Sequence, residues 1–106
     1  MPIVPKGVAY PEKLAAAIAS VERKLAPDVV RIRYTVENDW SGEQAVFFRI
    51  LLSDAASKPP RLHKVTRRVE ALIYQEVDPL NRWGLVPYLN FRSKSEQAVL
   101  REAAWV

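Results

Sequence analysis

Apolar positions recur at helical spacing in two stretches of the chain. The first begins at Pro11, a residue suited to the first helical turn, and ends before Pro27, because the residue preceding a proline is driven out of the helical region. Its apolar stripe consists of Leu14, Ala17, Ile18, Val21 and Leu25. The second stretch covers residues 60–77 and ends at Asp78-Pro79. Its stripe consists of Leu62, Val65, Val69, Leu72 and Ile73. Both stretches are therefore predicted to be amphipathic helices with one face toward a core.

Three further stretches have the pattern of β-strands. Residues 29–37 alternate, with an apolar face made by Val30, Ile32, Tyr34 and Val36. Residues 44–53 are mostly apolar on both faces, which is typical of a central strand, and turn residues at 38–42 predict an antiparallel pair. Residues 85–92 contain Pro87, which has no N–H to donate, so this strand is expected at an edge of the sheet or to be irregular.

The order of these elements predicts an α+β fold. A capping box at Ser93 and Glu96 introduces a final helix that reaches about residue 105, and residues 1–10 are expected to form an extended arm. The order is then α-β-β-α-β-α. Two helices on one face of a three-stranded mixed sheet make a two-layer sandwich. The chain is expected to be one domain over residues 1–106, with residues 93–106 as a C-terminal helix or tail.

This order resembles that of KH-type RNA-binding domains and of split β-α-β domains. The resemblance is one of architecture, because the chain has neither a G-x-x-G loop nor the glycine-and-aromatic strand motif of RNA-recognition sheets. It carries no expectation about function, since unrelated functions share folds of this kind.

Composition excludes several classes of chemistry. The chain has no cysteine and one histidine, His63, which argues against disulfides, thiol catalysis and ordinary zinc sites. It has three scattered glycines, no phosphate-binding loop and no G-x-S-x-G motif. We therefore expect a non-enzymatic protein without cofactor or metal. The carboxylates of Glu37, Asp39 and Glu43 cluster around the predicted hairpin tip, but their spacing matches no metal-binding pattern. No signal peptide and no apolar span of membrane length is found, so a cytoplasmic protein is expected.

Residues 58–68 carry five positive charges and no negative charge, whereas the whole chain has a net charge of +4. This run opens the second predicted helix, where the helix dipole disfavours cations. One interpretation is a face that contacts nucleic-acid phosphates through Arg61, Lys64, Arg67 and Arg68, with help from Arg31 and Arg33. The other interpretation is an ordinary solvated helix face on which Arg67 pairs with Glu70.

The sheet face opposite the helices is a second candidate surface. The predicted strands point Phe47, Arg49, Leu51 and Tyr88 outward there, among the arginines at 31, 33 and 92. Tyrosine, phenylalanine and arginine are enriched at protein interfaces, and arginines with aromatics on a sheet also suit single-stranded nucleic acid. A third interpretation has the face covered by the C-terminal helix. Trp105 near the end of the chain indicates that this helix docks somewhere.

The sequence thus favours a small interaction module that is a homodimer or a subunit of a protein complex. Phe47, Arg49, Leu51, Tyr88 and Trp105 form its predicted interface. The alternative is a nucleic-acid-binding protein that uses the basic helix face around residues 61–68.

Overall fold

The computed structural model describes residues 10–106. Residues 1–9, which make up nearly all of the predicted extended arm, lie outside the described residues. The elements in chain order are α2 (Pro11–Leu25), β1 (Val29–Asn38), β2 (Gln44–Leu52), α3 (Pro59–Leu72), the π-helical turn η1 (Ile73–Val77), α4 (Pro79–Trp83), β3 (Val86–Ser93), α5 (Lys94–Leu100) and the 3-10 turn η2 (Ala103–Trp105).

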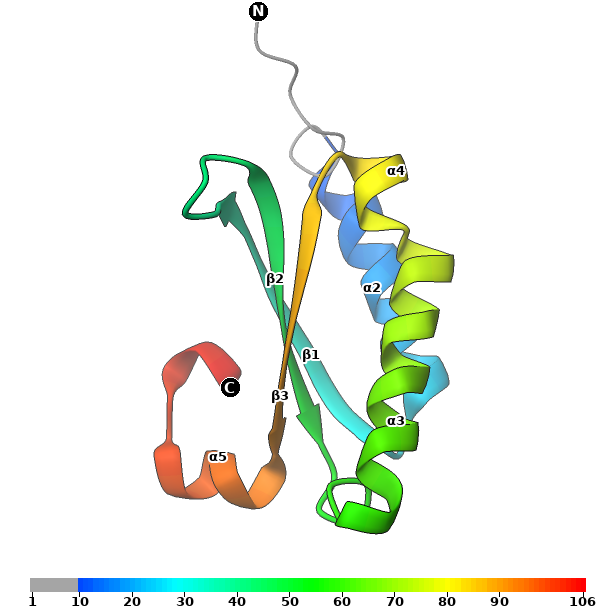
Figure 1. Ribbon diagram of the computed structural model, residues 1–106, viewed down its shortest axis with the longest axis vertical. Helices are drawn as coiled ribbons and strands as arrows, with labels where there is room; N and C mark the ends of the chain where they lie inside the picture. The colour runs from blue at the N-terminus through cyan, green and yellow to red at the C-terminus, as the bar shows by residue number, and fades with distance from the viewer. Residues whose placement is uncertain (1–9) are drawn as a thin grey trace, which may run out of the picture.

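The three strands form one mixed sheet in the order β1-β2-β3. Central strand β2 is antiparallel to β1 and parallel to β3. Helices α2 and α3 lie together on one side of the sheet, while α5 and the end of the chain lie on the other side (Figure 1). The predicted α+β fold is confirmed, as are the central position of β2 and the edge position of the Pro87 strand.

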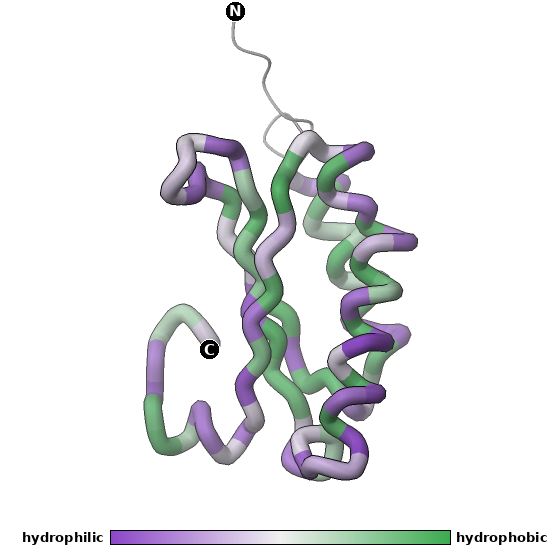
Figure 2. Tube along the Cα trace, viewed as in Figure 1, coloured by the Kyte–Doolittle hydropathy of each residue, from purple (hydrophilic) through white to green (hydrophobic). Residues whose placement is uncertain are grey.

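The core lies between the sheet and helices α2 and α3. Strand β2 fills its centre with Val46, Phe48, Ile50 and Leu52, all of them buried. The helices contribute their predicted stripes, so apolar and hydrophilic positions alternate around them (Figure 2). Leu62 is an exception, because it lies in the first turn of α3 and is exposed. The buried stripe of α3 begins one turn later, at Val65.

A β-bulge changes which valine of β1 reaches this core. The pairing steps from Val29 opposite Leu52 to Arg31 opposite Leu51, so one extra residue is inserted between them. Val29 is consequently 2% exposed and Val30 is 41% exposed. The prediction that Val30 faces the core is therefore wrong, because a strict period of two does not accommodate an inserted residue.

Two helical regions also differ from the prediction. Asp78 ends the long helix as predicted, with a left-handed φ of 48°, but Pro79 then starts the short helix α4 where a loop was expected. Proline suits this first helical position because no N–H is needed there. The final helix α5 has the predicted capping box at Ser93 but ends at Leu100, because Arg101 is left-handed with φ 54°. None of the helices in residues 10–106 is long and apolar enough to span a bilayer.

Candidate functional site

The sheet face turned away from α2 and α3 is here called the outer face. Its residues lie in rows across the three strands, and the rows differ in chemistry. Strand register places one residue of each strand side by side in every row. From the hairpin end, the rows are Glu37–Ala45–Val86, Thr35–Phe47–Tyr88, Arg33–Arg49–Asn90 and Arg31–Leu51–Arg92. The outer face therefore has an aromatic end near the β1–β2 hairpin and an arginine end near α5.

The arginine end is covered by the C-terminal arm, which we define as residues 101–106. Arg33 Nε donates a hydrogen bond of 2.7 Å to the carbonyl oxygen of Val106. Arg49 Nε donates an equally short bond, 2.7 Å, to the carbonyl oxygen of Ala104. Arg31 Nη1 lies 3.4 Å from the carbonyl oxygen of Trp105. The arm returns across the sheet in this way after α5 (Figure 1).

Trp105 anchors the arm. Its side chain is only 7% exposed, and the guanidinium of Arg92 lies 4.4 Å from its ring centroid. Arg92 also donates to Gln97 Oε1 at 2.9 Å and pairs with Glu102 at 3.3 Å. Leu51 beneath this end of the face is buried as well. Three members of the predicted interface, Arg49, Leu51 and Trp105, are thus engaged by contacts within the chain itself.

The aromatic end of the outer face carries a group of three neighbouring rings, Phe47, Tyr88 and Trp40, here called the aromatic ladder. Phe47 and Tyr88 lie nearly parallel, 13° apart, with ring centroids at 5.0 Å. Trp40 lies 5.4 Å from Tyr88 at an angle of 56°. Phe47 and Tyr88 are half-buried, whereas Trp40 is 84% exposed. The sequence placed Phe47 and Tyr88 on this face, whereas it placed Trp40 only in the hairpin turn and not on the face.

Asp39 ties the hairpin to the ladder. Its Oδ1 accepts hydrogen bonds from the backbone N–H of Ser41 and of Glu43, at 2.9 and 3.0 Å, and from the Ser41 hydroxyl at 2.7 Å. Its Oδ2 accepts the Tyr88 hydroxyl at 2.7 Å. The bonds from the Ser41 and Tyr88 side chains lower the pKa of Asp39. The bond to Asp39, together with desolvation and the charges of Asp39 and Glu43, raises the pKa of Tyr88.

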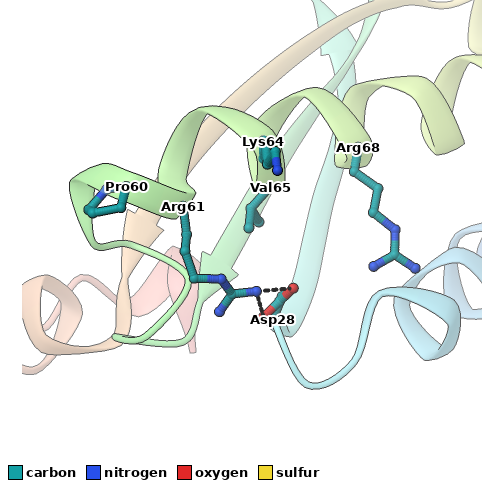
Figure 3. A pocket seen from close by; sticks show the side chains of 6 residues that line it. All are labelled: Asp28, Pro60, Arg61, Lys64, Val65 and Arg68. Atoms are coloured by element: carbon teal, nitrogen blue, oxygen red, sulfur yellow. Dashed lines mark hydrogen bonds and ion pairs between the residues drawn. The ribbon is translucent and has the colours of Figure 1, made fainter.

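The basic run lies on α3, beside the connection between α2 and β1. Part of it lines an open groove of about 310 Å³, whose walls are Asp28, Pro60, Arg61, Lys64, Val65 and Arg68 (Figure 3). Arg61 Nη2 binds both carboxylate oxygens of Asp28, at 2.9 and 3.0 Å. Arg68 Nη2 donates to the carbonyl oxygen of Lys24, in the last turn of α2, at 3.3 Å. Arg61 and Arg68 therefore hold α3 against the end of α2 and the start of β1.

The remaining cations of this stripe have no such partner. Within residues 10–106, Lys64 makes no ion pair, and Arg67 makes none with Glu70. The predicted Arg67–Glu70 pair is thus wrong, since an exposed pair gains too little to fix two long side chains. The start of α3 also offers few donors to an anion. Its first two residues, Pro59 and Pro60, have no N–H, and the N–H of Arg61 bonds to the Lys58 carbonyl at 2.9 Å.

Neither histidine chemistry nor metal binding is supported by the described residues. His63 is exposed on α3. In the described part of the chain, no group of three histidine, aspartate or glutamate side chains gathers closely enough to hold a metal ion. Comparison of the chain with models of protein families, with curated proteins and with solved structures finds no match.

Proposed function

We propose that this chain is a small non-enzymatic interaction module that binds a protein partner through the aromatic ladder. The observation that carries the proposal is the exposure of Trp40, 84%, beside the half-buried rings of Phe47 and Tyr88. Tryptophan and tyrosine are the residues most enriched at the energetic centres of protein interfaces. The partner is a second copy of the chain or another protein, and the proposed compartment is the cytoplasm, which suits a chain without cysteine.

Preorganisation supports this proposal. Binding ordinarily costs free energy because side chains at an interface lose rotamer freedom. Tyr88 is already fixed by its hydroxyl bond to Asp39 and by the parallel ring of Phe47. Trp40 follows directly after Asp39 in a turn that three bonds to that carboxylate hold in place. A partner would therefore meet a Tyr88 ring that loses little freedom on contact, beside a Trp40 whose backbone is already held.

A photoreactive phenylalanine analogue at position 40 tests the proposal. Irradiation in extracts of the source cells is expected to give a cross-linked product of discrete mass. The same analogue at position 99 is the control, because Val99 is also exposed but lies on α5, away from the ladder. Sedimentation of the purified chain shows whether the partner is a second copy of the chain, which would give a dimer, or a different protein. The proposal fails if position 40 gives no product beyond that of position 99 and the purified chain sediments as a monomer.

Nucleic-acid binding through the basic face of α3 is a second candidate. It is favoured by Lys64 and Arg67, which have no ion pair within residues 10–106. Binding of this kind is dominated by phosphate contacts and falls steeply with salt. A double substitution of Lys64→Glu and Arg67→Glu leaves the bonds of Arg61 and Arg68 in place and is expected to abolish any mobility shift of single- or double-stranded DNA and RNA. No shift by the unmodified chain at low salt removes this candidate.

A further inference from the structure

The charge around the aromatic ladder is opposite to that of the whole chain. Residues 37–43 contain three carboxylates and no lysine, arginine or histidine, although the chain has a net charge of +4. The nearest arginines on the outer face, Arg33 and Arg49, already donate to carbonyl oxygens of the C-terminal arm. These bonds hold the two arginines toward the arm, so the charges that act on the hairpin side of the ladder, at the Tyr88 hydroxyl, are those of Asp39 and Glu43.

Two of these carboxylates are free to bind a cation. Asp39 uses both of its oxygens in the turn and at Tyr88. The side-chain carboxylates of Glu37 and Glu43 accept no hydrogen bond and form no ion pair within residues 10–106. Glu43 lies close enough to act on the Tyr88 hydroxyl through its charge. The ladder thus has carboxylates beside it that are not neutralised.

The rings themselves add to this negative potential. Trp40 and Tyr88 meet at 56° with centroids 5.4 Å apart, so they form the two sides of a corner. The face of an aromatic ring carries negative quadrupole charge and attracts lysine and arginine cations, most strongly at tryptophan. An arginine also stacks flat on such a ring while its remaining N–H groups pair with a carboxylate.

We infer that the partner presents an arginine or lysine side chain to this corner. The cation lies against the rings of Trp40 and Tyr88 and pairs with Glu43 or Glu37, so the ligand is a basic segment of another protein. This inference rests on the proposed function and adds the chemistry of the partner.

A second copy of the chain would be the competing occupant, through its own α3. Two of the α3 cations, Arg61 and Arg68, are already bound within the chain. A contact between the ladder of one copy and α3 of the next would also be head-to-tail, an arrangement that grows into open chains unless it closes into a ring. A basic segment of a different protein meets neither difficulty.

The test is a titration with a short peptide of alternating glycine and arginine, followed by NMR of the three tryptophan indole N–H groups. The Trp40 signal is expected to shift, whereas that of Trp83, whose N–H bonds to the Val77 carbonyl at 2.8 Å, should not. Trp40→Ala is expected to weaken binding about fivefold, the effect of roughly one cation–π contact. Glu43→Gln should weaken it about two- to threefold. Glu70→Gln, which removes an exposed carboxylate on α3, is the matched control and should change nothing.

Five results would overturn the inference. A glycine–leucine peptide that shifts Trp40 where the arginine peptide does not would show an apolar partner and leave the interaction function standing. Equal weakening by Glu70→Gln and Glu43→Gln would show attraction to overall charge alone. Self-association abolished by Lys64→Glu and Arg67→Glu would assign the ladder to a second copy. Cross-links from position 40 without arginine-peptide binding would reject the cationic partner only. Loss of both, with a purified chain that sediments as a monomer, would also reject the proposed function.

Discussion

Replacing Trp105 by alanine removes the side chain that anchors the C-terminal arm on the outer face. A buried tryptophan removes about 150–250 Å² from water, which is worth about 4–6 kcal/mol at 25 cal/mol per Å². The measured loss should be smaller, because the arm can leave the sheet and its residues then regain backbone freedom. We therefore expect Trp105→Ala to lower the free energy of unfolding by about 2–4 kcal/mol, below the 3–5 kcal/mol usual for a central core aromatic.

Equilibrium urea unfolding followed by circular dichroism measures this loss. Hydrogen exchange measures arm docking separately, and the Nε–H groups of Arg33 and Arg49 should lose protection along with the arm, because they donate to its carbonyls. Val99→Ala is the control, since Val99 is exposed on α5 and its truncation should cost less than about 0.5 kcal/mol. If Trp105→Ala behaves like Val99→Ala in both measurements, the arm is not part of the folded structure. The arginine end of the outer face would then be open.

Three further substitutions test the fold. Ile50→Val in the fully buried centre of β2 should cost about 0.5–1.5 kcal/mol in urea unfolding; no loss would mean that the β2 core is loosely packed. Arg101→Gly should raise the unfolding free energy by about 0.5–1 kcal/mol, because glycine adopts the left-handed φ of 54° without strain. A lower unfolding free energy would show that the Arg101 side chain stabilises the fold more than its backbone conformation destabilises it. The Asp54 carboxylate accepts hydrogen bonds from the hydroxyl and the backbone N–H of Ser95, and these bonds lower the pKa of Asp54. The stability that Asp54 contributes is therefore present above its unfolded-state pKa, near 4, and is lost as the pH falls through its lower folded-state pKa. Asp54→Asn should therefore flatten the stability profile below about pH 4, and an unchanged profile would contradict the assignment.

The fold was predictable where the spacing of apolar residues along the chain matches the burial of those residues in the structure. Helical spacing gave the helix stripes, and the doubly apolar pattern of residues 44–53 gave the central strand. Pro87 indicated that its strand lies at the edge of the sheet. The bulge at Val29–Arg31 was not predictable, because its extra residue is detected only through the partner strand.

The candidate site was predictable only in part. Alternation along the strands placed Phe47 and Tyr88 on the outer face, and the lone terminal tryptophan indicated docking. Which half of that face the arm covers depends on contacts between residues more than 50 positions apart, such as Arg49 with Ala104, for which the chain has no local pattern. Trp40 was missed as a ladder member because its contact with Tyr88 crosses from the hairpin turn to another strand.

Apart from the side chains of Trp105 and Glu102, the arm is held through its main chain. Arg33 and Arg49 donate to backbone carbonyl oxygens, a group that every residue supplies. Side-chain identity therefore matters little at positions 103, 104 and 106, whereas position 105 must fill the space beneath Arg92. A hexapeptide of quite different composition, with an indole at the same place and a carboxylate three residues before it, would close the same half of the sheet.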